Sequence, residues 1–207
     1  MKSSSHTHTG GKARAKMAPS ASHPGEVRII GGLWKRSKLK VDGRAGLRPT
    51  PDRVRETLFN WLGQDLTGWR CVDVFAGTGA LGFEAASRGA LLVHVVEQDK
   101  ALVVQLESVK NQLLADTVQV LRADGLRFLQ TQLPTSLHLV LLDPPFEAAL
   151  FEPALAAAAR AVLPQGYVYL EAPMQWTDDG LATFGLQVYR HLQAGAVHAH
   201  LLRPCPA

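Results

Sequence analysis

The feature that most constrains the fold is an alternation of short apolar runs with helical patterns, which begins near residue 70. Runs of strand length are separated by segments whose apolar residues recur at helical spacing. This alternation predicts a doubly wound, mostly parallel α/β sheet, because parallel neighbours need a crossover that a helix usually provides. The expected strands are residues 71–75, 91–97, 117–122, 137–142 and 166–171, and the expected helices are residues 80–88, 99–115, 125–131 and 147–161. Residues 185–204 read as two further strands around a glycine-containing turn, which brings the expected sheet to seven strands.

The composition predicts one globular domain with an appended arm. The chain has 207 residues, of which 46% are hydrophobic, and this is enough to bury a substantial core. The longest apolar runs, residues 91–96 and 137–142, are far shorter than a membrane-spanning helix, so we expect no membrane segment. Two distant cysteines, Cys71 and Cys205, make neither a disulfide framework nor a zinc site, so a reducing cytoplasm is the expected location.

Charge is divided unevenly along the chain. The first 70 residues carry 14 Lys and Arg against 5 Asp and Glu, a net charge of +9, whereas the remaining residues carry 8 against 13, a net charge of −5. This division predicts that the N-terminal third binds a polyanion. A basic surface that only aids solubility is the alternative.

The first residues have the composition of a disordered arm. Residues 1–25 contain no acid and show no apolar periodicity, so they cannot offset the entropy lost on folding. We therefore place a disordered basic arm at residues 1–26. An organellar transit peptide and an over-extended start upstream of Met17 are the alternatives.

A basic hairpin follows this arm. The stretches "VRIIGG" and "SKLKV" have the pattern of two short strands, joined by a turn through Trp34, Lys35 and Arg36. Cationic side chains beside an aromatic ring are suited to a nucleic acid, and of the tryptophans only Trp34 is a candidate for base stacking, because helical spacing makes Trp61 a core residue.

A helix is expected after the hairpin, in "GLRPTPDRVRETLFNWL". Thr50 has the residue type of an N-cap, and Pro51 suits the first helical position. The pattern leaves Arg53 and Arg55 free for solvent or a ligand. The apolar stripe of this helix consists of Val54, Leu58, Trp61 and Leu62.

A glycine-rich loop follows the first strand of the alternation, in "DVFAGTGALGFEAASRGA". Gly77, Gly79 and Gly82 satisfy G-x-G-x-x-G, and Glu97 lies twenty residues after Gly77. Glycines let a backbone approach a nucleotide closely, and an acid at the end of the second strand accepts hydrogen bonds from ribose hydroxyls. NAD and S-adenosylmethionine both contain that ribose, so a dehydrogenase remains a hypothesis. A plain tight turn is the structural alternative for these glycines.

Two acids favour S-adenosylmethionine over NAD. Asp73 lies just ahead of the loop, where a carboxylate would meet the ammonium group of the methionine moiety but would repel a pyrophosphate. Asp124 follows the third strand, where it is placed to accept a hydrogen bond from an adenine amino group. An N-cap role before "GLRFL" is the alternative for Asp124.

The fourth strand ends in "LVLLDPPF", at the same edge of the expected sheet. Pro144 and Pro145 stiffen the turn and remove backbone donors, so that the turn presents acceptors. The Asp143 carboxylate and the Pro144 carbonyl could hold the hydrogens of an exocyclic amine and orient its lone pair toward a methyl donor. Phe146 would stack on an unpaired base. The alternative is a rigid turn whose Phe146 packs in the core.

These motifs resemble those of the class I S-adenosylmethionine-dependent methyltransferases that act on exocyclic amines. The resemblance rests on the glycine loop, "VVEQD", "LRAD" and "LVLLDPPF". The N-terminal stretches "RIIGGLWKRSKLKV" and "GLRPTPDRVRETLFNWL" resemble one branch, the RsmD family, which methylates the N2 amino group of a guanine in bacterial small-subunit (16S) ribosomal RNA. The resemblance covers about residues 28–171. It implies a methyltransferase domain over residues 70–207 and an RNA-binding extension over residues 27–69.

The resemblance also implies residue roles. The cofactor-binding residues would be Asp73, Phe75, Ala76, Gly77, Thr78, Gly79, Glu97, Gln98, Asp124 and Gly125. The catalytic residues would be Asp143, Pro144, Pro145 and Phe146. The RNA-binding residues would be Arg28, Lys35, Arg36, Lys38, Arg48, Thr50, Arg53 and Arg55.

The resulting hypothesis is a cytoplasmic, monomeric enzyme that methylates the N2 amine of a guanine in 16S ribosomal RNA, within a partly or fully assembled small subunit. The alternatives are a DNA or protein amine methyltransferase and a non-catalytic ribosome-assembly or RNA-binding module. We expect no metal site: His191, His198 and His200 have no suitably spaced ligand beside them except Cys205, and read as ordinary strand histidines.

Overall fold

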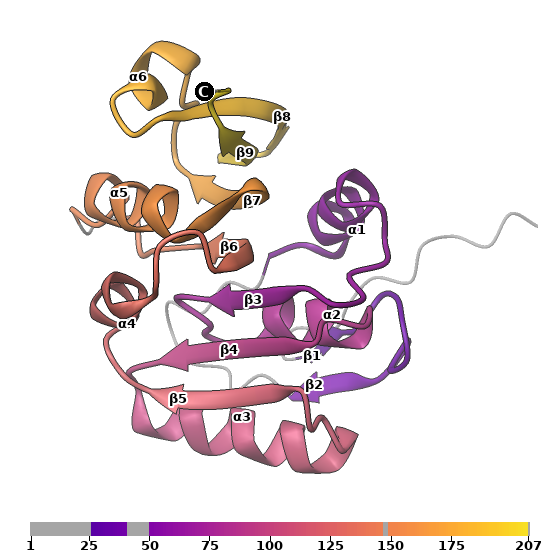
Figure 1. Cartoon of the computed structure of the whole chain (residues 1–207). Coiled ribbons are helices and arrows are strands. Elements are labelled where there is room, and N and C mark those ends of the chain that lie inside the picture. The colour runs from indigo at the N-terminus through magenta and orange to yellow at the C-terminus, as the bar shows by residue number, and fades with distance from the viewer. Residues whose placement is uncertain (1–25, 41–49, 147–148, 207) are drawn as a thin grey trace, which may run out of the picture.

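The computed structural model describes residues 26–40, 50–146 and 149–206. Within them, a seven-stranded sheet has the order β5-β4-β3-β6-β7-β9-β8, and helices cover both of its faces (Figure 1). The strands of the large sheet are β3 (Arg70–Asp73), β4 (Leu92–Glu97), β5 (Val118–Arg122), β6 (Leu137–Leu142), β7 (Val162–Ala172), β8 (Leu186–Ala194) and β9 (Val197–Pro204). The helices are α1 (Asp52–Trp61), α2 (Ala80–Ser87), α3 (Lys100–Leu113), α4 (Gly125–Thr131), α5 (Phe151–Ala161) and α6 (Asp178–Ala182).

The strand directions confirm the doubly wound, mostly parallel sheet. Strands β3 to β7 run parallel to one another, whereas β9 is antiparallel to both β7 and β8. The chain moves outward from β3 to β5 and then returns to place β6 on the other side of β3. Side chains at the carboxyl ends of β3 and β6 therefore meet where the strand order reverses, which is the usual ligand site of such sheets.

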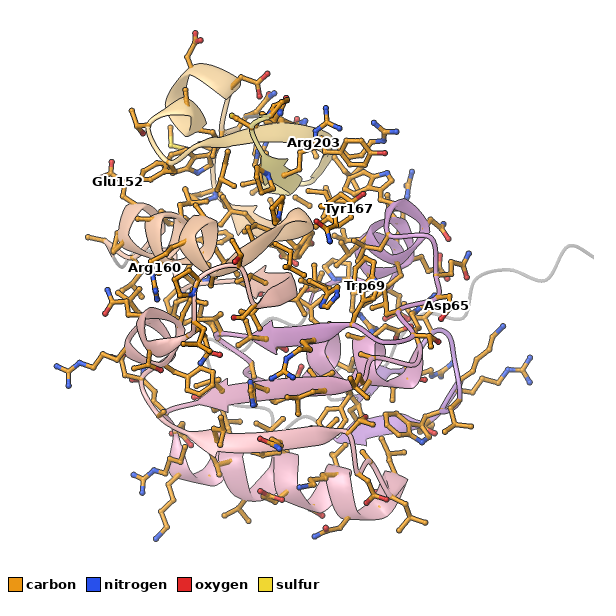
Figure 2. The ribbon with its side chains drawn as sticks, viewed as in Figure 1. Asp65, Trp69, Glu152, Arg160, Tyr167 and Arg203 are labelled. Atoms are coloured by element: carbon orange, nitrogen blue, oxygen red, sulfur yellow. The ribbon has the colours of Figure 1, made fainter. Side chains whose placement is uncertain are left out.

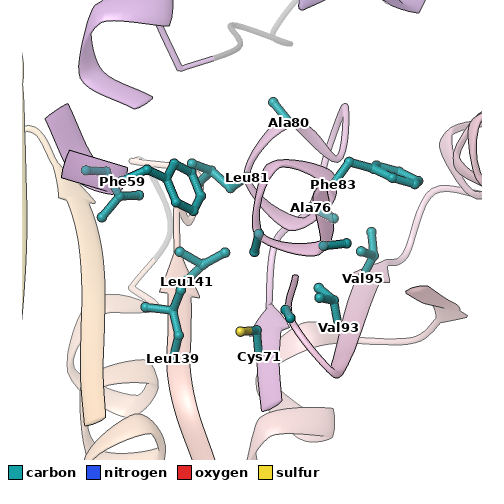
Figure 3. Packing of buried hydrophobic residues seen from close by; sticks show 14 of the residues in the cluster. Phe59, Cys71, Ala76, Ala80, Leu81, Phe83, Val93, Val95, Leu139 and Leu141 are labelled. Atoms are coloured by element: carbon teal, nitrogen blue, oxygen red, sulfur yellow. The ribbon is translucent and has the colours of Figure 1, made fainter. Parts of the chain in front are cut away.

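Alternate residues of the central strands pack into two separate hydrophobic cores, one on each face of the sheet. Leu139 and Leu141 of β6 pack in a layer with side chains of α1, α2 and α3, and Figure 3 shows this layer from close by. Val140 and Leu142 face the other way, toward α4 and α5. Because both faces are buried, these strands read as continuous apolar runs rather than as alternating ones.

A separate two-stranded sheet precedes the large one. It pairs β1 (Glu26–Arg28) with β2 (Lys38–Lys40) in antiparallel register, as the sequence predicted. Val27, Ile29 and Leu39 are buried in the same core as α2 and α3. The division of the chain into an extension and a methyltransferase domain stays a prediction, but these contacts show that the hairpin shares the core of the large sheet.

A buried carboxylate attaches the hairpin to α2. Glu84 is fully buried, and its oxygens accept hydrogen bonds from the backbone N–H groups of Ile30 and Gly31, each at 2.7 Å. Arg55 and Arg88 pair with the same carboxylate at 3.5 and 2.8 Å. Glu84 thus holds β1, α1 and α2 together.

Two expectations for the α1 region are wrong. Arg55 is not free for solvent: its side chain is fully buried between Glu84 and Asp52, because the turn of helix that carries it faces α2. Thr50 does not cap α1. The helix begins at Asp52 with Pro51 at the N-cap position, and the Thr50 hydroxyl donates instead to Glu171, 121 residues away.

No helix in the described residues is both long enough and apolar enough to cross a membrane.

Candidate active site

A cavity of about 830 Å³ opens at the carboxyl ends of β3, β4, β5, β6 and β7. The glycine loop, the acids after β4 and β5, and the proline turn after β6 all contribute to its wall. All of the residues predicted to bind the cofactor except Gly79 line this cavity, as do all four predicted catalytic residues. The structure therefore brings the predicted site residues together, while their roles stay predictions.

The glycine loop turns from β3 into α2 through two residues with positive φ. Gly77 has φ 51° and Gly79 has φ 76°. A Cβ atom on Gly79 would lie 2.5 Å from Leu106 Cδ2, so a larger residue would push α2 and α3 apart. Gly77 N–H donates to Glu97 Oε2 at 2.9 Å, which ties the loop to the end of β4. The loop is thus more than a plain tight turn, since it also closes one wall of the cavity.

Asp73 lies at the floor of the cavity. It is 2% exposed and accepts a hydrogen bond from Gly82 N–H at 2.9 Å. Burial, and then the nearby Glu97 and Glu171 carboxylates, raise the pKa of Asp73 to about 7 despite that hydrogen bond. A cation in the cavity would favour the ionised form of this carboxyl.

The position of Asp124 is compatible with both roles considered for it, the N-cap of α4 and a contact with adenine. It is the N-cap of α4, accepting from Arg127 N–H at 2.9 Å, and it also lines the cavity. The N-cap role is confirmed, and the adenine contact stays a prediction. Beside it, a Cβ atom on Gly125 would lie 1.9 Å from the Val74 carbonyl oxygen, so only glycine allows α4 to approach β3 this closely.

The proline turn leaves Asp143 half-buried and Phe146 exposed. Asp143 follows the last residue of β6, and burial, then Glu171 and Asp73, raise its pKa well above the ordinary value. Phe146 is 39% exposed and touches Phe151 at a ring-centroid distance of 6.4 Å. The alternative in which Phe146 packs in the core is therefore wrong, and the exposed ring lines the cavity.

Sequence reasoning missed a second set of cavity residues. Glu171 at the end of β7 lines the cavity beside Asp143, and Thr50 lines it from the N-terminal segment. The β8–β9 hairpin adds Ala194, Ala196 and Val197. A signal for Glu171 did exist in the sequence, because "YVYLEA" ends an apolar strand with an acid just as "LVLLD" does.

The predicted RNA-binding residues do not form one surface. Lys35, Arg36, Lys38 and Arg53 are exposed, Arg28 is half-buried, and Arg48 lies outside the described residues. Thr50 and Arg55 are buried in the contacts described above, so neither offers its side chain to solvent. Of the two arginines in α1, only Arg53 remains a candidate for a phosphate contact.

Other aromatic and histidine clusters are internal contacts. Trp69 stacks on Tyr167 with ring centroids 6.2 Å apart, and both residues are labelled in Figure 2, so this ring already has a stacking partner within the fold. Rings of His191 and His198 stack at 5.2 Å, and His200 is buried against β7. In the parts of the chain that the structure describes, no group of three or more His, Cys, Asp and Glu side chains is arranged to hold a metal.

The electrostatics of the cavity distinguish between the two nucleotide cofactors considered. The residues that line it include five acids and, within the described chain, no Lys, Arg or His; the acids are Asp73, Glu97, Asp124, Asp143 and Glu171. Two phosphates would be repelled here, whereas a sulfonium and an ammonium group would relieve the repulsion among the acids. The residues present therefore fit S-adenosylmethionine and do not fit NAD.

Comparisons with known proteins agree with this site. The family model described as Conserved hypothetical protein 95 matches residues 27–203. A ribosomal RNA small subunit methyltransferase D from Haemophilus influenzae is 41% identical over 182 residues, covering 82% of this chain and 94% of that protein. The protein of the same name from Escherichia coli K12 is 46% identical over 134 residues, covering 65% of this chain and 67% of that protein.

A solved structure shares the fold. A putative methyltransferase from Escherichia coli superimposes with a TM-score of 0.74 at 33% identity, covering 87% of this chain and 99% of that one. The seven-stranded sheet is thus that of a class I methyltransferase, whose methyl donor is S-adenosylmethionine. The chain belongs to the family that these proteins define, the RsmD family.

Proposed function

We propose that this protein transfers a methyl group from S-adenosylmethionine to the exocyclic N2 amine of a guanine in small-subunit (16S) ribosomal RNA. The observation that carries the proposal is the acidic cavity in which the glycine loop and the Asp143–Phe146 turn face the same space. Membership of the RsmD family supports the choice of ribosomal RNA, because relatives named as small-subunit ribosomal RNA methyltransferases match most of this chain.

The cofactor would lie along the ends of β3, β4 and β5. When bound, it supplies an electrophilic methyl group on a sulfonium. Glu97 would accept hydrogen bonds from the ribose hydroxyls, and Asp73 would face the ammonium group, since both line the cavity. Asp124 and Gly125 would bound the adenine. Gly77 N–H, which donates to Glu97 at 2.9 Å, fixes the acid in position for this contact.

The amine would be held by the turn after β6. Asp143 and the Pro144 carbonyl would accept the two hydrogens of the amino group, which fixes the plane of the base and aims the nitrogen lone pair. Phe146 would stack on the base, whose entry requires it to be unpaired or flipped out. Once the nitrogen carries the methyl group it loses one proton, and Asp143, whose raised pKa makes it a stronger base than an exposed aspartate, would receive it.

Ribosomal RNA would bind outside the cavity. The exposed Lys35, Arg36 and Arg53 are suited to phosphate contacts, and the excess of positive charge in the first 70 residues supports the N-terminal part of the chain as the RNA-binding one. We also propose a partly or fully assembled small subunit as the substrate. We further propose that the protein acts in the cytoplasm, as a monomer and without a metal ion.

The test is transfer of labelled methyl groups from S-adenosylmethionine to small subunits, to protein-free ribosomal RNA and to genomic DNA, all prepared from a strain that lacks this protein. We expect label in small-subunit RNA, faster with subunits than with free RNA, and loss of label with Asp143→Ala. Asp116→Ala is the matched control, since Asp116 is an exposed acid that does not line the cavity.

Each other outcome identifies an alternative. Label in DNA or protein would overturn the ribosomal substrate. No label anywhere, with tight RNA binding, would favour a non-catalytic binding module.

A further inference from the structure

Glu171 stands beside the catalytic carboxylate. Strands β6 and β7 are parallel neighbours in which Leu141 pairs with Tyr169 and Leu142 with Leu170. Asp143 and Glu171 each follow directly, so they share a register position on strands about 4.8 Å apart. Side chains two residues apart on a strand share a face, so Asp143 and Glu171 extend the rows of Leu141 and Tyr169 into the cavity.

Two hydroxyl groups fix the orientation of Glu171. Its Oε1 atom accepts hydrogen bonds from Thr50 Oγ1 at 2.6 Å and from Tyr169 Oη at 2.9 Å. Both donors are themselves buried, Tyr169 completely and Thr50 to 6% exposure. A carboxylate held in this way is preorganised as an acceptor, because it cannot rotate without losing both bonds.

The surrounding charges support an acceptor role. Burial raises the pKa of Glu171, and the Thr50 and Tyr169 hydroxyls and the nearby Arg55 limit that rise because they stabilise the ionised form. Asp143 and Asp73 face the same space and compete with Glu171 for negative charge. A ligand that donates hydrogen bonds to both Asp143 and Glu171 would relieve this repulsion.

We propose that Glu171 determines base specificity by accepting a hydrogen bond from guanine N1–H while Asp143 holds the N2 amine. This inference rests on the proposed function and assigns the choice of base within it. Guanine carries two donors at adjacent positions of its ring edge, N1–H and the N2 amine, and the paired carboxylates offer two adjacent acceptors. Adenine presents a lone pair at N1 beside its amine, and that lone pair would meet the Glu171 carboxylate and be repelled.

The substitution Glu171→Gln should reverse this preference. Because Thr50 and Tyr169 both donate to Oε1, the amide oxygen of Glu171→Gln stays with them and the NH₂ group turns toward the cavity. That group is a donor, which suits a base with a lone pair at N1. The base 2-aminopurine has such a lone pair and keeps the amine at the position that it has in guanine.

The experiment compares these two bases at one position. Small-subunit RNA is built by splinted ligation with guanine or 2-aminopurine at the nucleotide that the wild-type protein labels, and is assembled into subunits. We expect the wild-type protein to methylate guanine faster. In Glu171→Gln the ratio of guanine to 2-aminopurine rates should fall about ten- to hundredfold, the effect of one hydrogen bond to a charged group.

The outcomes separate the inference from the proposed function. No label at guanine with wild-type protein overturns the proposed function and the inference with it. Label at guanine together with an unchanged ratio in Glu171→Gln overturns the inference alone. If Glu171→Gln does not fold, Thr50→Val and Tyr169→Phe each remove one donor to Oε1, and a smaller fall in the same ratio is expected of both.

A binding measurement tests the same contact without turnover. The fluorescent 2-aminopurine riboside is titrated into protein saturated with S-adenosylhomocysteine, and quenching by stacking on Phe146 reports entry into the cavity. Tighter binding by Glu171→Gln than by wild type is the expected result. Equal or weaker binding by the variant would contradict the proposal.

Discussion

The attachment of the N-terminal hairpin depends on Glu84, and replacing it tests that claim. Glu84→Gln keeps the shape of the side chain but removes the charge that Arg55 and Arg88 share. It also places an NH₂ group where the backbone N–H groups of Ile30 or Gly31 need an acceptor. Breaking a buried ion pair from one side costs about 3–5 kcal/mol, and Arg55 keeps its bond to Asp52, so we expect a loss of about 3 kcal/mol in the free energy of unfolding.

Urea denaturation measures this loss, with Glu56→Gln as the control because Glu56 is an exposed acid on the same helix as Arg55. The control should change stability by less than about 0.5 kcal/mol. Hydrogen exchange at Ile30 and Gly31 should accelerate in Glu84→Gln by more than global unfolding explains, because these amides lose their acceptor. A loss below about 1 kcal/mol, with unchanged exchange, would refute the role given to Glu84.

Three further predictions concern the site. The folded-state pKa of Asp73 is raised to about 7, so the folded state holds an extra proton between about pH 4 and pH 7, and stability falls as pH rises through that window. Asp73→Asn should remove this pH dependence and raise stability at pH 8 by at most about 4 kcal/mol. The same variant should bind S-adenosylmethionine more weakly in calorimetry. A variant that is less stable at pH 8 than wild type would contradict it. The double variant Lys35→Glu, Arg36→Glu should bind subunits more weakly and with a smaller dependence on salt, while its affinity for the cofactor stays unchanged. An unaltered salt slope would exclude these two residues from the interface. Phe146→Ala should slow methylation at limiting RNA by about tenfold or more, because stacking on the base is lost. The melting temperature should change little, because the ring is 39% exposed. A large fall in stability with normal activity would mean that Phe146 has a structural role.

Local patterns predicted the elements of the fold well where strands are buried on both faces. Residues 137–142 form β6 as expected, and the helix expected at 125–131 is α4. The boundary between α5 and β7 was less accurate. The expected strand began at residue 166, but β7 begins at Val162, directly after the last residue of α5. Pairing of Val162 with Leu137 extends the strand, and a partner 25 residues away leaves no local signal.

The candidate site also contains residues that local patterns could predict and residues that they could not. Glycines and acids that follow strands were identifiable because their residue types and positions are local features, and the sheet then brings them to one edge. Thr50 and Arg55 were misassigned because their roles depend on Glu171 and Glu84, which lie 121 and 29 residues further along the chain. A threonine before a proline and an arginine in an amphipathic helix look the same whether they face solvent or a buried carboxylate.

The most direct test of the account is the nucleoside composition of small-subunit ribosomal RNA from cells that lack this protein. The account predicts that N2-methylguanosine falls by one residue per subunit, that the wild-type gene restores it, and that neither Asp143→Ala nor an empty vector does. Unchanged N2-methylguanosine in the small-subunit RNA of those cells would contradict the central claim that this cavity methylates a ribosomal guanine.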